Sequence, residues 1–301
     1  MKKLIAVIAA AMAAVSVLAG CGREPSDAQD ERMWPENVTY SNLSDSDSRE
    51  LLEGLMSDAQ ISGSRQKILF DHIDEINGIM EPDELTDGFE SRSISKPKYD
   101  PYEIQDRWME KYPDFLGYNC RITAYTLFSD FTDISEDAKI RDSFILMDLD
   151  SLAADDSAAP GGTDKFSRMF SSVPTENTKD VSVHLKNWQK SLSERGFAFE
   201  KNDTASLISV VFHDQLDSDE LFVGHTGIFF DTHEGKLYFM EKLAFQEPYQ
   251  LCAFENRAQL SDYLMKKYDT AYGQSTAAPM VLENGGLIEG YRTVPENMKA
   301  Q

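Results

Sequence analysis

The sequence predicts an α+β fold, with a helical first half followed by an antiparallel sheet. Apolar residues recur at helical spacing as far as about residue 195. Beyond that point they gather in short runs rich in Ile, Val and Phe, which are typical of strands. Helices followed by neighbouring strands are the pattern of α+β proteins.

The predicted elements follow from local signals. Helices are expected at residues 48–59, 65–80, 103–112, from about 119, at 164–171, 180–195 and 258–268. Pro113 and Gly196 end two of them, and Asn119 is a good N-cap residue. Strands are expected at residues 206–212, 221–230, 236–245 and 279–282.

The first twenty residues resemble the signal peptide of a bacterial lipoprotein. Two lysines precede an apolar run, residues 4–17, that is short for a membrane span. Small residues then stand directly before Cys21. The resemblance implies cleavage before Cys21, a lipid such as palmitate on its sulfur, and an extracytoplasmic protein anchored to the lipid bilayer. An ordinary signal peptide, in which Cys21 is incidental, is the alternative.

The rest of the chain divides into a tether and one domain. Residues 1–20 are the predicted signal peptide, residues 21–38 a lipidated cysteine with a polar, flexible tether. Residues 39–301 show no break longer than a loop and are predicted to form a single α+β domain.

Composition excludes three classes of protein. The formal net charge is -23, from 29 basic and 52 acidic side chains. This excludes a general nucleic-acid-binding protein, because phosphate contacts need Lys and Arg. The 3 cysteines are too few for a disulfide scaffold or a Cys-rich zinc module.

Cys120 is the candidate nucleophile. If Asn119 caps the helix, Cys120 lies in its first turn, where unpaired N–H groups and the helix dipole favour a thiolate. Such N–H groups also donate to an oxyanion, and Asn119 and Gln250 are candidate substrate or oxyanion contacts. Two alternatives stay open: Cys120 is a small buried apolar residue, or it forms a disulfide with Cys252.

His225 and Glu241 are the candidate partners of Cys120. A loop over residues 231–235 would set His225 directly opposite Glu241, whereas a loop one residue shorter would set Lys242 there. A carboxylate beside an imidazole orients the ring and supports its protonated form. One face of the strand is expected to carry Val223, His225, Gly227 and Phe229.

The order of these groups resembles the papain-like fold, especially the compact cell-wall hydrolases of the NlpC type. The resemblance implies that the Cys120 thiolate attacks an amide carbonyl, His225 shuttles the proton and Glu241 orients the ring. The substrate would be an envelope or secreted peptide, such as a peptidoglycan stem peptide. The chain departs from the family's pattern in having Asn119 before the cysteine and Arg121 after it.

A closer resemblance covers nearly the whole mature chain. The chain is identified as a member of a bacterial lipoprotein family catalogued only as domain of unknown function 4300. The matching stretches include residues 40–43 (YSNL), 117–123 (GYNCRIT), 171–180 (SSVPTENTKD), 207–214 (LISVVFHD), 221–227 (LFVGHTG) and 241–250 (EKLAFQEPYQ). The family implies no activity, so it supports the domain boundary and the lipid anchor.

Two functions are therefore expected. The first is a membrane-anchored thiol amidohydrolase or peptidase, and the alternative is a non-catalytic lipoprotein that binds a ligand or partner through the same cleft. No cofactor or metal is expected. The acidic residues between 148 and 156 lack the Gly and Glu of a calcium loop and are interpreted as a solvated acidic loop. No metal-ligand spacing relates His184, His213 and His233.

Overall fold

The computed structural model describes residues 32–233 and 235–300. The predicted signal peptide and the predicted lipidation site, Cys21, lie outside these residues. Trp34–Gln301 forms one compact unit, in which helices and an antiparallel sheet are combined. The α+β prediction is confirmed at this level.

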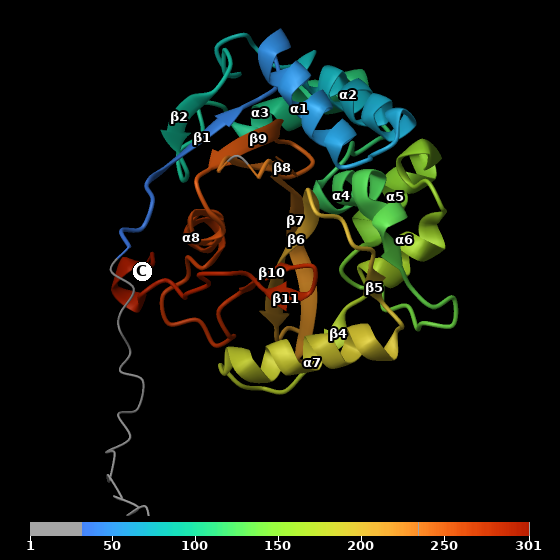
Figure 1. Ribbon diagram of the computed structural model, residues 1–301, viewed down its shortest axis with the longest axis vertical. Coiled ribbons are helices and arrows are strands. Elements are labelled where there is room, and N and C mark those ends of the chain that lie inside the picture. The colour runs from blue at the N-terminus through green and yellow to red at the C-terminus, as the bar shows by residue number, and fades with distance from the viewer. Residues whose placement is uncertain (1–31, 234, 301) are drawn as a thin grey trace, which may run out of the picture. The chain divides into compact units, whose positions relative to one another are not determined.

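The sheet is antiparallel throughout, with strand order β11-β10-β6-β7-β8-β9-β1-β2 (Figure 1). A short strand, β4 (Val173–Pro174), also pairs with β7, and β3 (Thr132–Asp133) pairs with β5 (Ala198–Phe199) separately. The strands of the main path are β1 (Asn37–Ser41), β2 (Glu90–Ser93), β6 (Ala205–Asp214), β7 (Glu220–Asp231), β8 (Leu237–Lys242), β9 (Tyr249–Phe254), β10 (Met280–Glu283) and β11 (Gly286–Leu287).

The first half of the chain is not purely helical, because β1 and β2 extend the sheet beyond β9. The expected strands at residues 206–212, 221–230 and 279–282 are confirmed. The strand expected at residues 236–245 ends instead at Lys242. The sequence analysis missed β9, whose residues mix polar and apolar types and give no clear run.

The expected helices all form, and one further helix, α5, was not predicted. Aspartates cap several of them: the Asp45 carboxylate accepts from the Ser48 N–H at 2.8 Å. The α-helices are α1 (Ser46–Asp58), α2 (Gly63–Asn77), α3 (Pro101–Lys111), α4 (Cys120–Phe128), α5 (Leu146–Ala154), α6 (Thr163–Met169), α7 (Val181–Glu194) and α8 (Arg257–Tyr268). Short 3-10 turns cover Ser129–Phe131, Asp156–Ala158 and Glu296–Met298.

Two apolar cores lie on opposite faces of the sheet. One core joins strand residues such as Ile228 and Met240 to the helices of the first half. The other joins Phe229 and Phe239 to α8, which Figure 1 shows on its own side of the sheet. Burying each such side chain stabilises the folded state by about 1.5–3 kcal/mol. The alternation of side chains along each strand therefore determines which residues face α8 and which face the other helices.

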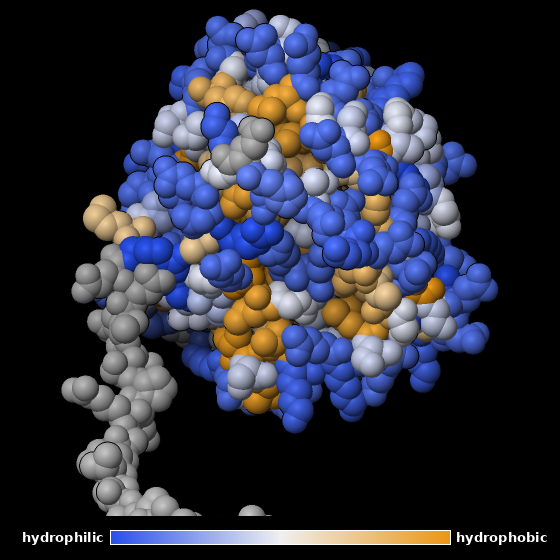
Figure 2. Space-filling view, viewed as in Figure 1, coloured by the Kyte–Doolittle hydropathy of each residue, from blue (hydrophilic) through white to orange (hydrophobic). Residues whose placement is uncertain are grey.

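The surface is mostly polar, as the charge predicts. Figure 2 shows hydrophilic residues over most of the viewed face, with apolar groups gathered in a few places. In the part of the chain that the structure describes, no helix has the length and apolar character needed to cross a membrane.

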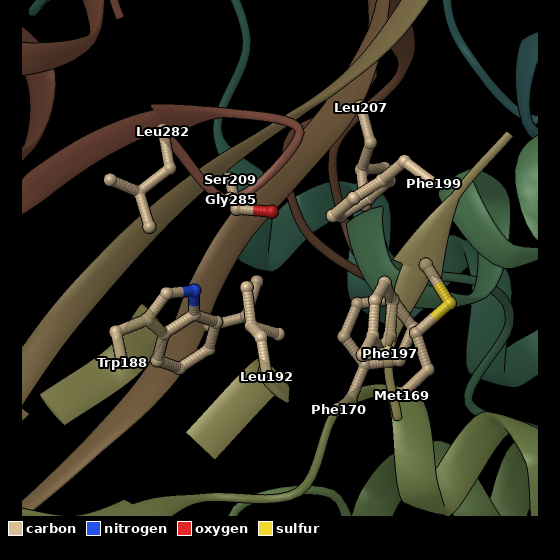
Figure 3. A pocket seen from close by; sticks show the side chains of 11 residues that line it. Met169, Phe170, Trp188, Leu192, Phe197, Phe199, Leu207, Ser209, Leu282 and Gly285 are labelled. Carbon is tan, nitrogen blue, oxygen red and sulfur yellow. The ribbon is translucent and has the colours of Figure 1, made fainter. Parts of the chain in front are cut away.

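A small apolar cavity lies between α7 and the sheet (Figure 3). Trp188 and Leu192 of α7 line it from one side, and Leu282 and Ser209 from the other. Its volume is about 20 Å³, room for no more than about one water. This cavity is therefore a packing feature of the fold.

Candidate active site

Cys120 begins α4, as the sequence predicts. The Asn119 side-chain oxygen accepts from the Ile122 N–H at 3.0 Å, which is the expected N-cap. Cys120 is 5% exposed, and its sulfur lies 4.0 Å from the Gly224 carbonyl oxygen of β7. The positive end of the α4 dipole therefore lies at the thiol.

A bulge in β7 brings the thiol and His225 together. Val211 pairs with Val223 but Val210 pairs with His225, so Gly224 is one extra residue. A Cβ on Gly224 would lie 2.3 Å from the Phe212 ring, so only glycine fits there. The bulge turns Val223 to the helical side and His225 toward α8, which corrects the prediction that both share one face.

The N-terminus of α4 occupies an edge of β7 that β8 does not cover. The β7–β8 ladder runs from the Asp231–Leu237 pair to the Gly227–Glu241 pair. Beyond it, Arg121 donates to the Val223 carbonyl at 2.9 Å. Cys120 can therefore approach His225 although α4 and α8 pack on opposite faces of the sheet.

Arg121 and Asn119 are held by a buried carboxylate. Asp148 of α5 is 0% exposed and accepts from Arg121 Nε at 2.8 Å and Nη2 at 2.6 Å. It also accepts from the Asn119 amide at 2.8 Å. The interpretation of this acidic stretch as a solvated loop is therefore wrong at Asp148. Both polar atoms of the Asn119 side chain make contacts within the fold, and its role as a substrate or oxyanion contact stays a prediction.

His225 and Glu241 form a direct buried pair. Nε2 of His225 lies 2.6 Å from Oε2 of Glu241, and the two side chains are 1% and 0% exposed. The predicted register is wrong by two residues, since Glu241 pairs with Gly227. A shift of two residues keeps the Glu241 side chain on the predicted face of β8, so it still reaches His225 across the two strands. Lys242, the alternative partner, donates instead to backbone carbonyls of residues 244, 245 and 247.

Two further side chains hold the other oxygen of Glu241. Tyr263 of α8 donates its hydroxyl to Oε1 at 2.5 Å, and the Cys252 thiol donates to the same oxygen at 3.4 Å. Cys120 and Cys252 are both free and buried, so the alternative of a disulfide between them is not formed. The buried carboxylate thus has three donors, as an uncompensated buried charge would be costly.

The electrostatics favours an imidazolium between a thiolate and a carboxylate. Burial by itself lowers the pKa of His225, but the hydrogen bonds and charges of Cys120 and Glu241 raise it to about 9. Burial by itself raises the pKa of Cys120, yet His225, and to a lesser extent Arg121, bring it below its ordinary value. The pKa of Glu241 is lowered too, because His225 outweighs the effect of burial.

The two nitrogens of His225 have different surroundings. Nε2 is bound to Glu241, whereas among the described residues Nδ1 has no partner that meets hydrogen-bond geometry. This leaves Nδ1 for the Cys120 sulfur, whose interaction with the ring raises the pKa of His225 although the pair falls outside strict hydrogen-bond geometry. Tyr268 packs on the same ring, with centroids 5.0 Å apart.

Gln250 lies beside Glu241 on β9, paired with it across the strands. It lines a cavity of about 40 Å³ with Tyr263 and Glu247, and it is 4% exposed. Its place is thus beside the carboxylate end of the site. The prediction of Gln250 as an oxyanion donor stays a prediction.

The roles of Tyr263, Tyr268 and Asp148 were not predicted from the sequence. Each lies on a helix where helical spacing alone makes it an ordinary core or surface residue. The available signal was the Glu241 carboxylate within an apolar strand, which needs donors from whatever packs over it. In the described residues, no cluster of three or more His, Cys, Asp or Glu side chains is arranged to hold a metal ion.

Comparison with known proteins identifies one family. The model of a family described as "Domain of unknown function (DUF4300)" matches residues 39–288. No curated protein and no solved structure matches the chain. The match covers α4 and β6 to β10, and therefore every residue of the site described above.

Proposed function

The chain belongs to the DUF4300 family, and we propose that it is a thiol hydrolase of papain-like arrangement. Cys120 is the nucleophile, His225 the general base and acid, and Glu241 the group that orients His225. One observation carries the proposal: a buried His225 lies between the Glu241 carboxylate and a thiol at a helix N-terminus. The proposed substrates are amide bonds of envelope or secreted peptides.

The proposed reaction has two halves. The Cys120 thiolate attacks the amide carbonyl carbon, and a C–S bond forms as N–H groups in the first turn of α4 stabilise the oxyanion. The C–N bond then breaks, and His225 gives its proton to the departing amine. In the second half His225 takes a proton from water, the hydroxide attacks the thioester, and the thiolate leaves. Glu241 stays ionised throughout.

The first test is the rate of alkylation of Cys120 by iodoacetamide against pH, read by peptide mass spectrometry on the whole chain. We expect rapid labelling well below the free-thiol pKa of about 8.5. In His225→Ala the rate at pH 6 should fall about 100-fold, because the thiolate loses its counter-ion. Cys252 is the internal control, since burial and Glu241 hold the pKa of its thiol well above the ordinary value.

The second test is turnover of synthetic stem peptides and casein-derived peptides, followed by liquid chromatography. Cys120→Ala should abolish cleavage without changing the thermal midpoint by more than a few degrees. Cys252→Ser, the matched thiol substitution, should keep most of the activity. Equal cleavage by wild type and Cys120→Ala would reject the assignment of the nucleophile.

The second candidate function is ligand or partner binding without catalysis. The low exposure of Cys120 and His225, 5% and 1%, favours it, because a nucleophile must meet its substrate. Labelling of Cys120 only after denaturation would make this the better proposal.

We also propose that the protein is an extracytoplasmic lipoprotein anchored through Cys21. The small residues before Cys21 and the polar segment after it support this. Metabolic labelling with an alkyne palmitate analogue should mark the wild-type chain and not Cys21→Ser. Equal labelling of both chains would remove the proposed anchor.

A further inference from the structure

The oxygen of Glu241 that faces away from His225 has its own set of donors. Oε1 accepts from the Tyr263 hydroxyl at 2.5 Å and from the Cys252 thiol at 3.4 Å. Glu241 is 0% exposed, so water does not orient the carboxylate. Its rotation about the last side-chain bond is therefore set by these two donors and by His225.

Tyr263 is itself fixed by the fold. It is 1% exposed and lies in the middle of α8, whose Leu260 and Leu264 pack into the core on this face of the sheet. The Tyr263 ring packs on Phe254 of β9, with centroids 5.6 Å apart. The hydroxyl is thus held over Glu241 by packing on two elements.

We propose that Tyr263 is a positioning residue of the site: its hydroxyl holds Oε1 of Glu241 so that Oε2 faces His225. This inference rests on the proposed function for its consequence in catalysis. The geometric claim, that Tyr263 orients the Glu241–His225 pair, holds whether or not Cys120 turns over a substrate.

The direction of the effect follows from the groups that face the pair. His225 of β7, Cys252 and Gln250 of β9, and Tyr263 and Lys267 of α8 surround Glu241. Cys120 and Tyr268 face His225 from α4 and α8. Without the tyrosine hydroxyl, Oε1 keeps only a weak thiol donor, so the carboxylate is free to rotate and Oε2 is no longer held toward His225. His225 then holds its proton less strongly, and the Cys120 thiolate is less populated.

The test compares Tyr263→Phe with Tyr291→Phe in the whole chain. Tyr291 is the matched control, because its hydroxyl donates to the Pro279 carbonyl at 2.7 Å, outside the site. The first readout is the titration of His225 by NMR with labelled histidines, assigned by its loss in His225→Gln. The second is the pH profile of Cys120 alkylation by iodoacetamide.

We expect Tyr263→Phe to lower the pKa of His225 by about one unit and to slow labelling of Cys120 at pH 6 about tenfold. Tyr291→Phe should leave both unchanged, even if it lowers the thermal midpoint as much. Cys252→Ala should lower the pKa of His225 by a smaller amount. Cys252→Ser keeps a donor for Glu241 and should give a pKa of His225 like that of the wild type.

Two failures are distinguishable. If the His225 titration in Tyr263→Phe is that of the wild type, Tyr263 only packs and the inference is overturned. If that titration shifts while wild-type Cys120 labels no faster than a free thiol, the positioning claim stands and the proposed hydrolase fails.

Discussion

His225 and His72 are both almost fully buried, 1% and 5% exposed, and their pKa values move in opposite directions. The pKa of His225 is raised to about 9, whereas burial lowers that of His72 to about 4. Each histidine has an aromatic neighbour: Tyr268 for His225, and Tyr118, stacked with centroids 3.4 Å apart, for His72. Burial and aromatic packing therefore do not decide the charge of a histidine here.

The difference lies in the acidic partners: Cys120 and Glu241 both raise the pKa of His225, whereas His72 has only carboxylates as acidic neighbours. Glu241 is fully buried and lies 2.6 Å from His225, while the Asp155 side chain is 28% exposed and lies 3.7 Å from His72. Asp155 also accepts from the Tyr118 hydroxyl at 2.7 Å and from the Ser157 hydroxyl at 2.7 Å. A carboxylate that is partly exposed to water and farther from the ring does little to offset the desolvation of an imidazolium. The comparison teaches that this fold builds one charged and one neutral buried histidine from similar parts.

Glu241→Gln should have the largest effect on the pKa difference between His225 and His72. Without this negative charge His225 keeps Cys120 as its acidic partner, and its pKa should fall from about 9 toward the ordinary value of about 6.5. Alkylation of Cys120 at pH 6 should slow about 100-fold, and unfolding should become easier by about 3–5 kcal/mol, as for a broken buried ion pair. The NMR titration and urea denaturation measure both effects, and an unshifted His225 would contradict the role of the carboxylate.

His72→Phe tests how the neutral histidine contributes to the pH dependence of stability. The folded pKa of His72, about 4, lies below its value of 6.5 in the unfolded chain, so the unfolded chain binds more protons between these pH values. Stability contributed by neutral His72 is thus full above pH 6.5 and is lost as the pH falls toward 4. The 2.5-unit difference corresponds to about 3 kcal/mol.

We expect His72→Phe to retain packing on Tyr118 and to remove this part of the acid sensitivity. Urea unfolding at pH 7 and pH 4.5 measures it. The exposed His233, replaced by Gln, is the control and should leave the difference between the two pH values unchanged. A variant as acid-sensitive as the wild type would show that His72 is charged in the folded protein.

Asp155→Asn should give the smallest effect. The amide still accepts from the Tyr118 hydroxyl, and only a partly screened charge near His72 is lost. The pKa of His72 should fall further by less than about one unit, as followed by NMR. Asp71→Asn removes an exposed charge on α2, the helix that carries His72, and should shift the pKa of His72 less than Asp155→Asn does. A rise in the pKa of His72 in Asp155→Asn would contradict this account.

Local signals predicted the parts of the site that local physics controls. The Asn119 cap, the start of α4 and the strand that carries His225 depend on neighbours within a few residues. The sequence predicted that His225 and Glu241 lie on the same face of the sheet, but not which residues pair across the two strands. The face depends only on whether a residue's position in its strand is odd or even, whereas the pairing depends on where the hairpin loop lies.

The remaining parts depend on contacts between distant segments. The buried Asp148 is bound by Arg121 and Asn119 from another segment, and the bulged Gly224 lies against the Phe212 ring of the neighbouring strand. Neither interaction leaves a periodic pattern in the sequence. The strands β1 and β2, which extend the sheet beyond β9, lie far from β9 in sequence, and the edge strand β2 carries no apolar run.

The extra residue in β7 makes chain length, as well as side-chain chemistry, a determinant of the site. Removing Gly224 would delete no reactive group, and regular alternation would still place Val223 and His225 on opposite faces. The deletion would remove the bulge, and with it the Gly224 carbonyl that lies 4.0 Å from the Cys120 sulfur. It would therefore change how β7 meets the start of α4 without changing the face on which His225 lies.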